Sequence, residues 1–126
     1  MLWDDQRMAR TVVIVDDHAD FRAQAAQLLQ SAGYVVVGSC RDGASALDAI
    51  GTLRPDVVLL DVELPDVDGF GVMARCDALP DSPAIVLIST REIGDYGGRV
   101  GRSLATGFIT KAELSARSLA EVIARR

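Results

Sequence analysis

Five short runs of consecutive apolar residues recur along the chain, and they are rich in β-branched side chains. Runs of this kind are typical of strands buried on both faces of a parallel sheet, because a strand with one solvated face would alternate apolar and polar residues. The predicted strands are Val12–Val15, Tyr34–Val37, Val57–Leu60, Ile85–Ile88 and Gly107–Ile109.

The segments between these runs have the spacing of amphipathic helices. In the first segment, apolar residues recur on one helical face from Phe21 to Ala32, and Gly33 follows as a stop. Asp42 is a suitable N-cap for the second helix. The expected helices cover residues 19–32, 42–53, 70–79, 92–106 and 112–123. Strands and helices therefore alternate through a single α/β domain, with right-handed crossovers and helices on both faces of the sheet.

Residues 92–106 form the weakest of the five predicted helices. Gly94, Gly97, Gly98 and Gly101 lie inside this segment. Each of these glycines costs a helix up to about 1 kcal/mol relative to alanine. We therefore expect a short, frayed or mobile helix here.

The composition fits one globular domain and excludes several classes of protein. The chain has 126 residues, of which 49% are hydrophobic, and its formal net charge is −5. The acidic balance argues against nucleic-acid binding through a basic face. No apolar run approaches the roughly 18 residues of a membrane span, and the start of the chain lacks the pattern of a secretory signal. We expect a cytoplasmic protein in which residues 1–10 form a leader, with Trp3 exposed or folded back on the domain.

Polar and charged residues follow four of the five predicted strands. In an open α/β sheet, ligands bind at the carboxyl ends of the strands, so these side chains are expected at the functional edge. They are Asp16 and Asp17 after the first strand, Asp61 after the third, Ser89 and Thr90 after the fourth, and Lys111 just beyond the fifth.

Lys111 is the only lysine, whereas the other 12 basic residues are arginine. One interpretation is a coding bias with a single chance exception. The other is that position 111 requires a compact ammonium, which binds phosphate as a point charge where a planar guanidinium would not fit. The count alone does not distinguish the two.

The chemistry of these groups is complementary. Three clustered carboxylates raise one another's pKa unless a cation lies among them, and hard oxygen ligands with open positions suit Mg²⁺. A hydroxyl and an ammonium suit the oxygens of a phosphoryl group. The pattern therefore indicates Mg²⁺ and a phosphoryl group, with one carboxylate as the nucleophile.

Over residues 11–125 the chain resembles the receiver domains of bacterial two-component response regulators. The resemblance implies the flavodoxin-like fold, a doubly wound five-stranded parallel sheet of order 2-1-3-4-5 with five helices, and a receiver domain over residues 11–126. The motifs that carry it are VVIVDDH at 12–18, DVVLLDVELPDVDG at 56–69, IS at 88–89 and GFITK at 107–111.

The resemblance also implies a role for each site residue. Asp61 corresponds to the phosphoacceptor. For Mg²⁺ (or Mn²⁺), Asp17 corresponds to the direct ligand, Asp16 to a carboxylate that reaches the metal through water, and the backbone carbonyl of Glu63 to a further ligand. Lys111 corresponds to the lysine that pairs with the phosphoryl group.

Four further positions correspond to parts of the family's switch and loop. Ser89 corresponds to the hydroxyl that closes on the phosphoryl group, and Phe108 to the aromatic whose rotamer follows activation. Pro65 and Gly69 correspond to the residues that shape the loop after the acceptor.

The chain departs from the family pattern at several places. Thr90 stands where alanine or glycine is usual, and together with Glu63 and Arg91 it is a candidate for tuning the rate. Ala112 replaces the proline that often follows the lysine. Phe108 lacks the phenolic hydroxyl of a tyrosine.

Five other residues are given plain structural interpretations. His18, the only histidine, is taken as a helix-entry residue rather than a metal or proton-transfer group. Cys40 and Cys76 are taken as small buried apolar residues. Asp66 and Asp68 are taken as turn residues rather than metal ligands.

The resemblance implies a signalling switch rather than an enzyme. A sensor histidine kinase or a phosphotransfer protein would supply the phosphoryl group, and the fourth helix, fifth strand and fifth helix would pass the change to a downstream protein or output domain. No contact with nucleic acid or membrane is expected, and dimerisation on phosphorylation stays open.

Other interpretations also stay open. A stand-alone receiver is favoured over a domain cut from a DNA-binding transcription factor. A receiver-like interaction module that is not phosphorylated is disfavoured by the complete residue set. A phosphoaspartate-type hydrolase is disfavoured because Glu63 stands where that class has a second aspartate.

Overall fold

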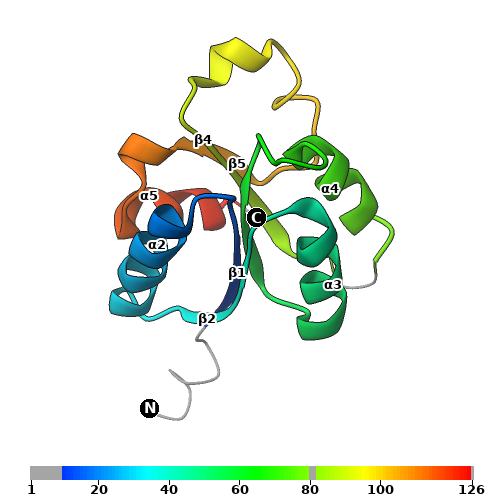
Figure 1. Cartoon of the computed structure of the whole chain (residues 1–126). Coiled ribbons are helices and arrows are strands. Elements are labelled where there is room, and N and C mark those ends of the chain that lie inside the picture. Colours follow the sequence, from blue (N-terminus) through cyan, green and yellow to red (C-terminus); the bar gives the residue numbers. More distant parts are fainter. Residues whose placement is uncertain (1–9, 80–81, 126) are drawn as a thin grey trace.

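The computed structural model describes residues 10–79 and 82–125, which contain one parallel five-stranded sheet. Its strand order is β2-β1-β3-β4-β5, as the family resemblance implies (Figure 1). β1 pairs with β3 so that Val15 lies beside Leu60, which places the residues after β1 next to the end of β3. The strands are β1 (Thr11–Val15), β2 (Val35–Cys40), β3 (Val57–Asp61), β4 (Ala84–Ser89) and β5 (Gly107–Thr110).

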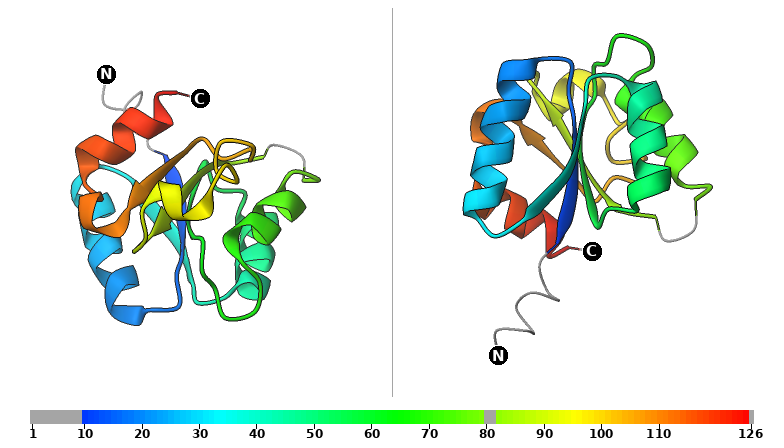
Figure 2. Two further views of the ribbon diagram at one scale, coloured as in Figure 1. Left: turned by 90° about the horizontal axis from the view of Figure 1, so that it is seen from above. Right: turned by 60° about the horizontal axis from the view of Figure 1, so that its bottom comes forward.

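Helices cover both faces of this sheet, two on each face (Figure 2). α2 (Ala19–Ser31) and α5 (Ala116–Ile123) lie on one face, and α3 (Gly43–Leu53) and α4 (Gly69–Cys76) lie on the other. Each face has its own apolar core. In β1, Val13 and Val15 pack toward α3 and α4, whereas Val12 and Ile14 pack toward α2 and α5. The unbroken apolar runs of the sequence follow from this double burial.

The prediction of five helices is wrong, because the described residues contain four α-helices. The segment expected to be the fourth helix forms one 3-10 turn, η1 (Ile93–Tyr96), followed by further turns. Gly97 ends η1 with a φ of 59°, in the left-handed region that glycine adopts without strain. The glycines that weakened this segment in the sequence thus prevent an α-helix altogether.

Two other helix boundaries differ from the prediction. The last helix was expected from residue 112, but a 3-10 turn, η2 (Lys111–Glu113), comes first and Ser115 then caps α5 by accepting a hydrogen bond from Ser118 N. α4 ends at Cys76 rather than at residue 79. Asp42 caps α3, as predicted, by accepting from Ser45 N at 2.8 Å.

Several expectations concern the remaining parts of the chain. The predicted leader lies outside the described residues except for Arg10, and Trp3 is among the residues that are not described. Among the residues that are described, no helix is long and apolar enough to cross a membrane. Cys40 and Cys76 are buried as free thiols, and burial raises the pKa of each.

Candidate functional site

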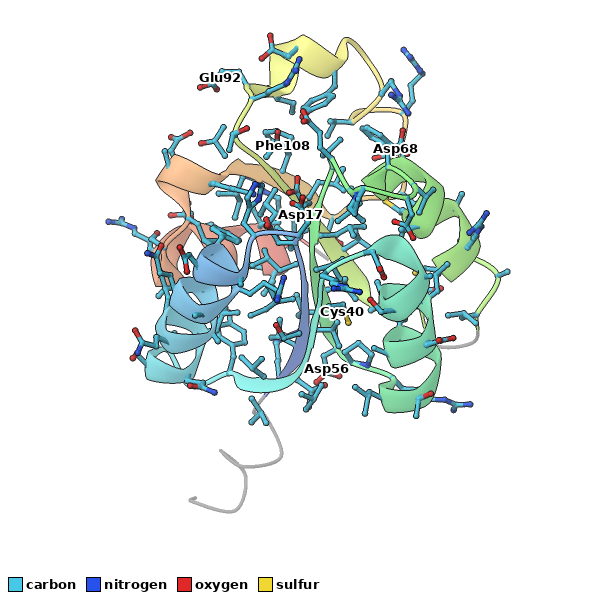
Figure 3. The ribbon with its side chains drawn as sticks, viewed as in Figure 1. Asp17, Cys40, Asp56, Asp68, Glu92 and Phe108 are labelled. Carbon is cyan, nitrogen blue, oxygen red and sulfur yellow. The ribbon has the colours of Figure 1, made fainter. Side chains whose placement is uncertain are left out.

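The charged residues predicted at the strand ends meet at one edge of the sheet. Figure 3 shows Asp17 and Phe108 near this edge, whereas Asp56 lies at the opposite end of the strands. Asp16 follows β1, Asp61 is the last residue of the neighbouring β3, and Lys111 follows β5. The parallel topology therefore brings residues 50 positions apart in the sequence into contact.

Lys111 bridges two buried carboxylates at this edge. Its Nζ lies 2.5 Å from Asp16 Oδ2 and 3.1 Å from Asp61 Oδ2. The Asp16 side chain is fully buried, and those of Asp61 and Lys111 are only 5% and 12% exposed. The ammonium also lies over the Phe21 ring, 4.7 Å from its centroid. A single lysine thus supplies the positive charge that two buried carboxylates require.

The pKa values of the two carboxyls diverge because their surroundings differ. Burial raises the pKa of Asp61 to about 6, and the hydrogen bond from Glu63 N and the charge of Lys111 offset this effect only in part. At Asp16, burial is outweighed by hydrogen bonds from Lys111 and the His18 backbone, and the pKa lies below its ordinary value. For Lys111, the desolvation that lowers its pKa is outweighed by the two carboxylates, which raise it.

Asp17 and His18 complete the acidic cluster on its solvent side. His18 Nδ1 lies 3.0 Å from Asp16 Oδ1 and 3.0 Å from Asp17 Oδ1. Ligand atoms of Asp16, Asp17, His18 and Asp61 all lie within 4.8 Å of one another. This donor set is dominated by hard carboxylate oxygens and is open to solvent at Asp17, so it fits a divalent cation such as Mg²⁺. His18 is the N-cap residue just before α2, which fits its interpretation as a helix-entry residue, but its ring also contacts Asp16 and Asp17 in this cluster.

Ser89 lies at the end of β4 and is 1% exposed. Its Oγ lies 2.5 Å from the Tyr96 hydroxyl and accepts a hydrogen bond from Arg91 N at 2.9 Å. The Tyr96 hydroxyl donates to Glu63 Oε1 at 3.2 Å, and Arg91 Nε pairs with the same oxygen at 2.9 Å. Glu63 and Arg91, which the sequence placed beside the site, are therefore ion-paired with each other.

Tyr96 is the residue that the sequence interpretation missed. Its ring packs between two aromatic side chains, with centroids 6.1 Å from Phe70 and 6.0 Å from Phe108. Phe108, the predicted switch aromatic, thus contacts η1 directly. The only available sequence signal was an aromatic residue in a glycine-rich segment, which does not identify a partner.

Thr90 follows Ser89 directly after the end of β4. It is exposed and lines an open depression of about 470 Å³ together with His18, Phe21 and Lys111.

The loop after Asp61 is fixed by helix capping and by one close backbone approach. Asp66 accepts from Gly43 N and Ala44 N at the start of α3, and Asp68 caps α4. These contacts support their interpretation as turn residues. A Cβ on Gly69 would lie 2.7 Å from the Asp61 carbonyl oxygen, so this position admits only glycine without a shift of the backbone. Pro65 lies in the same loop and is exposed.

The fold and this edge together define a flavodoxin-like α/β domain with an acidic, lysine-bridged site at the carboxyl ends of its strands. The chain matches the profile of the response regulator receiver domain over residues 12–124. It therefore belongs to that family and is a receiver domain of two-component signalling.

Individual relatives agree with this family. The chain is 31% identical over 101 residues to the DNA-binding transcriptional activator EvgA of Escherichia coli, covering 80% of this chain and 50% of that protein. It is 37% identical to a protein-glutamate methylesterase/protein-glutamine glutaminase of Symbiobacterium thermophilum, covering 79% of this chain and 28% of that protein. The chain thus spans half or less of the length of these curated relatives.

A solved receiver structure has the same fold. The signal receiver domain of the response regulator NarL from Mycobacterium tuberculosis superposes with a TM-score of 0.82 at 31% identity, covering 94% of this chain and 98% of that one. The predicted family and the predicted sheet order are confirmed.

Proposed function

We propose that Asp61 accepts a phosphoryl group from the phosphohistidine of a sensor histidine kinase or phosphotransfer protein. The observation that carries this proposal is Lys111 Nζ, which lies 3.1 Å from Asp61 Oδ2 at the carboxyl edge of the sheet. A compact ammonium beside a buried carboxylate is suited to pairing with the oxygens of a group bound to that carboxylate. In this proposal residues 11–126 form the receiver domain.

In the transfer step, a carboxylate oxygen of Asp61 attacks the phosphorus of the phosphohistidine. The new O–P bond forms as the P–N bond breaks, and the departing imidazole nitrogen takes up a proton. The attacking carboxyl must be ionised, which it is in most molecules at pH 7 because its pKa is about 6. The hydrogen bond from Glu63 N to Asp61 Oδ1, at 3.0 Å, orients the nucleophile.

Mg²⁺ (or Mn²⁺) is proposed to bind beside the acceptor. Asp16, Asp17, Asp61 and the backbone carbonyl of Glu63 are the proposed ligands, with Asp16 acting through water. When bound, the ion neutralises negative charge that accumulates on the phosphoryl oxygens during transfer. The support for this site is the convergence of carboxylate oxygens within 4.8 Å, with Asp17 facing solvent.

After transfer, Lys111 and Ser89 are proposed to hold the phosphoryl group. The new charge of about −1.5 to −2 favours a conformation in which Ser89 and Phe108 have moved, and residues 92–123 change their surface. A downstream protein or output domain then binds that surface. The domain catalyses its own phosphorylation and acts as a switch rather than on a separate substrate.

The test is phosphorylation by a small-molecule donor. Incubation with acetyl phosphate or phosphoramidate and Mg²⁺ should add one phosphoryl mass to the protein, and Asp61→Asn and Asp61→Ala should abolish it. Asp48→Asn is a matched control, because Asp48 is an exposed carboxylate on α3 and should leave labelling unchanged. Undiminished labelling of Asp61→Ala would contradict the assignment.

A further inference from the structure

A chain of hydrogen bonds joins Ser89 to Glu63 through Tyr96. Ser89 Oγ lies 2.5 Å from Tyr96 Oη, and Tyr96 Oη lies 3.2 Å from Glu63 Oε1. We call these three residues the hydroxyl chain. It connects the buried end of β4 with the loop after β3 by way of the exposed η1 turn.

The direction of each hydrogen bond follows from the groups involved. The Glu63 carboxylate only accepts, so the Tyr96 hydroxyl donates its one proton to Glu63. Ser89 Oγ already accepts from Arg91 N at 2.9 Å. Because the Tyr96 proton is directed at Glu63, Ser89 is the donor in its bond with Tyr96 Oη, and its proton is then not available to a group on Asp61.

The rest of the local structure holds Tyr96 in this position. Its ring packs between Phe70 and Phe108, and the ion pair from Arg91 Nε to Glu63 Oε1, at 2.9 Å, fixes the acceptor at the end of the chain. Burial, together with the hydrogen bond and charge of Glu63, raises the pKa of the Tyr96 phenol, so the hydroxyl keeps its proton at neutral pH. The hydroxyl chain is thus stable without any contribution from a phosphoryl group.

We propose that Tyr96 is a positioning residue that holds the Ser89 hydroxyl in the inactive arrangement and competes with the phosphoryl group for its proton. This inference rests on the proposed function, in which Ser89 donates to the phosphoryl group on Asp61. A hydroxyl has one proton, so Ser89 must leave Tyr96 before it serves the phosphoryl oxygen.

Release of Tyr96 has a direct structural consequence. When Ser89 turns away, η1 loses the hydrogen bond that joins it to β4. The Tyr96 ring is then held less firmly against Phe108. The residues that follow η1 form turns rather than a helix, and they are held instead by the Arg99–Asp68 ion pair at 3.2 Å and by the buried Val100. Because Phe108 has no hydroxyl of its own, the coupling between Ser89 and the moving surface passes through Tyr96 rather than through the aromatic residue of β5.

The proposal is tested by the affinity for beryllofluoride, a phosphoryl analogue, in the presence of Mg²⁺. Tyr96→Phe keeps the ring but removes the competing hydroxyl, so it should bind beryllofluoride about three- to tenfold more tightly than the wild type, as expected for the loss of one neutral hydrogen bond. In a Ser89→Ala background the same Tyr96→Phe change should have no effect, because the two residues act through one bond.

Tyr34→Phe is the matched control, since Tyr34 is the only other tyrosine and packs on the opposite side of the sheet. It should leave the affinity unchanged. Equal or weaker binding by Tyr96→Phe, or an equal gain in the Ser89→Ala background, would overturn the proposal.

A second measurement separates this inference from the proposed function. Amide hydrogen exchange of residues 92–106, without beryllofluoride, should be faster in Tyr96→Phe than in the wild type and unchanged in Tyr34→Phe. If beryllofluoride does not bind the wild type, the proposed function fails, and the exchange rates still decide whether Tyr96 holds this segment. Unchanged exchange in Tyr96→Phe would overturn the proposal whether or not Asp61 is phosphorylated.

Discussion

Lys111 lies closer to Asp16 than to the proposed phosphoacceptor. Its Nζ is 2.5 Å from Asp16 Oδ2, compared with 3.1 Å from Asp61 Oδ2. The lysine is therefore positioned by two carboxylates at once, and a phosphoryl group on Asp61 would compete with Asp16 for the same ammonium. The side chain at position 111 must therefore fit between two carboxylates as well as carry a positive charge.

Lys111→Arg should separate phosphorylation from the conformational change. A planar guanidinium keeps the charge but does not fit between two buried carboxylates as a compact ammonium does, so Asp61 should still be labelled while the switch responds weakly. Couplings in such switches are roughly 1–3 kcal/mol. The measurement is the change in NMR shifts of residues 92–123 on adding beryllofluoride.

The control for this substitution is Arg117→Lys on α5, where the side chain is 91% exposed. It exchanges the same two residue types at an exposed position, where the shape of the side chain is not constrained. Its NMR shifts should therefore change with beryllofluoride as those of the wild type do. Shift changes in Lys111→Arg that match the wild type in size and location would show that the single lysine is an accident of composition.

Asp61→Asn should stabilise the fold in EDTA, and the gain should depend on pH. Asp61 has an ordinary pKa of about 4 and a folded pKa of about 6, so between these pH values the folded state binds more protons than the unfolded state. The free energy of unfolding therefore falls as the pH rises through this range. Above that range the buried charge costs about 1–3 kcal/mol. Urea denaturation should therefore show a gain of this size at pH 7 and little gain at pH 4.

Asp48→Asn provides the comparison for that experiment, because Asp48 is exposed on α3. Its effect on the free energy of unfolding should be small at both pH values. A gain for Asp61→Asn that is the same at pH 4 and pH 7 would contradict the proposed cause.

The sheet was predictable because its signal is local. β1 and β3 are buried on both faces of the sheet, so their residues form uninterrupted apolar runs that can be recognised in the sequence. The strand order then places Asp16 beside Asp61. The same runs predict that Asp16, Asp17, Asp61 and Lys111 lie at strand ends, and the family resemblance implies the strand order that brings them together. They are fixed by topology, and the structure brings all four together.

The segment after β4 was not predictable in the same way. Alternation suggested an α-helix, but the glycines favour turns, and Gly97 has a positive φ. The hydrogen bond between Ser89 and Tyr96 depends on that turn, and no spacing rule links the two positions. His18 was undervalued because its contact with Asp17 depends on the rotation of a single ring at the start of α2.

Mg²⁺ should stabilise the wild type against heat and urea. At a free ion concentration 10 to 100 times the dissociation constant, linkage gives about 1–3 kcal/mol. Asp17→Ala should remove this gain, because Asp17 is the proposed direct ligand, and EDTA should remove it from the wild type. Asp20→Ala, an exposed carboxylate in the first turn of α2, should keep it. Equal stabilisation of Asp17→Ala and the wild type would count against the site.

Gly69→Ala should disturb the acceptor itself. The added Cβ would lie 2.7 Å from the Asp61 carbonyl oxygen and 3.0 Å from Val62 Cα. Both are backbone atoms, so the strand end must shift, at a cost of about 1–3 kcal/mol in the free energy of unfolding. Because the nucleophile moves with its backbone, the rate of labelling by acetyl phosphate should also fall.

Gly51→Ala in α3 is the matched control, since nothing lies within 4 Å of its added Cβ, and it should stabilise the helix by about 0.5–1 kcal/mol. If Gly69→Ala is as stable as Gly51→Ala and labels at the wild-type rate, the close approach of residue 69 to Asp61 does not constrain the site.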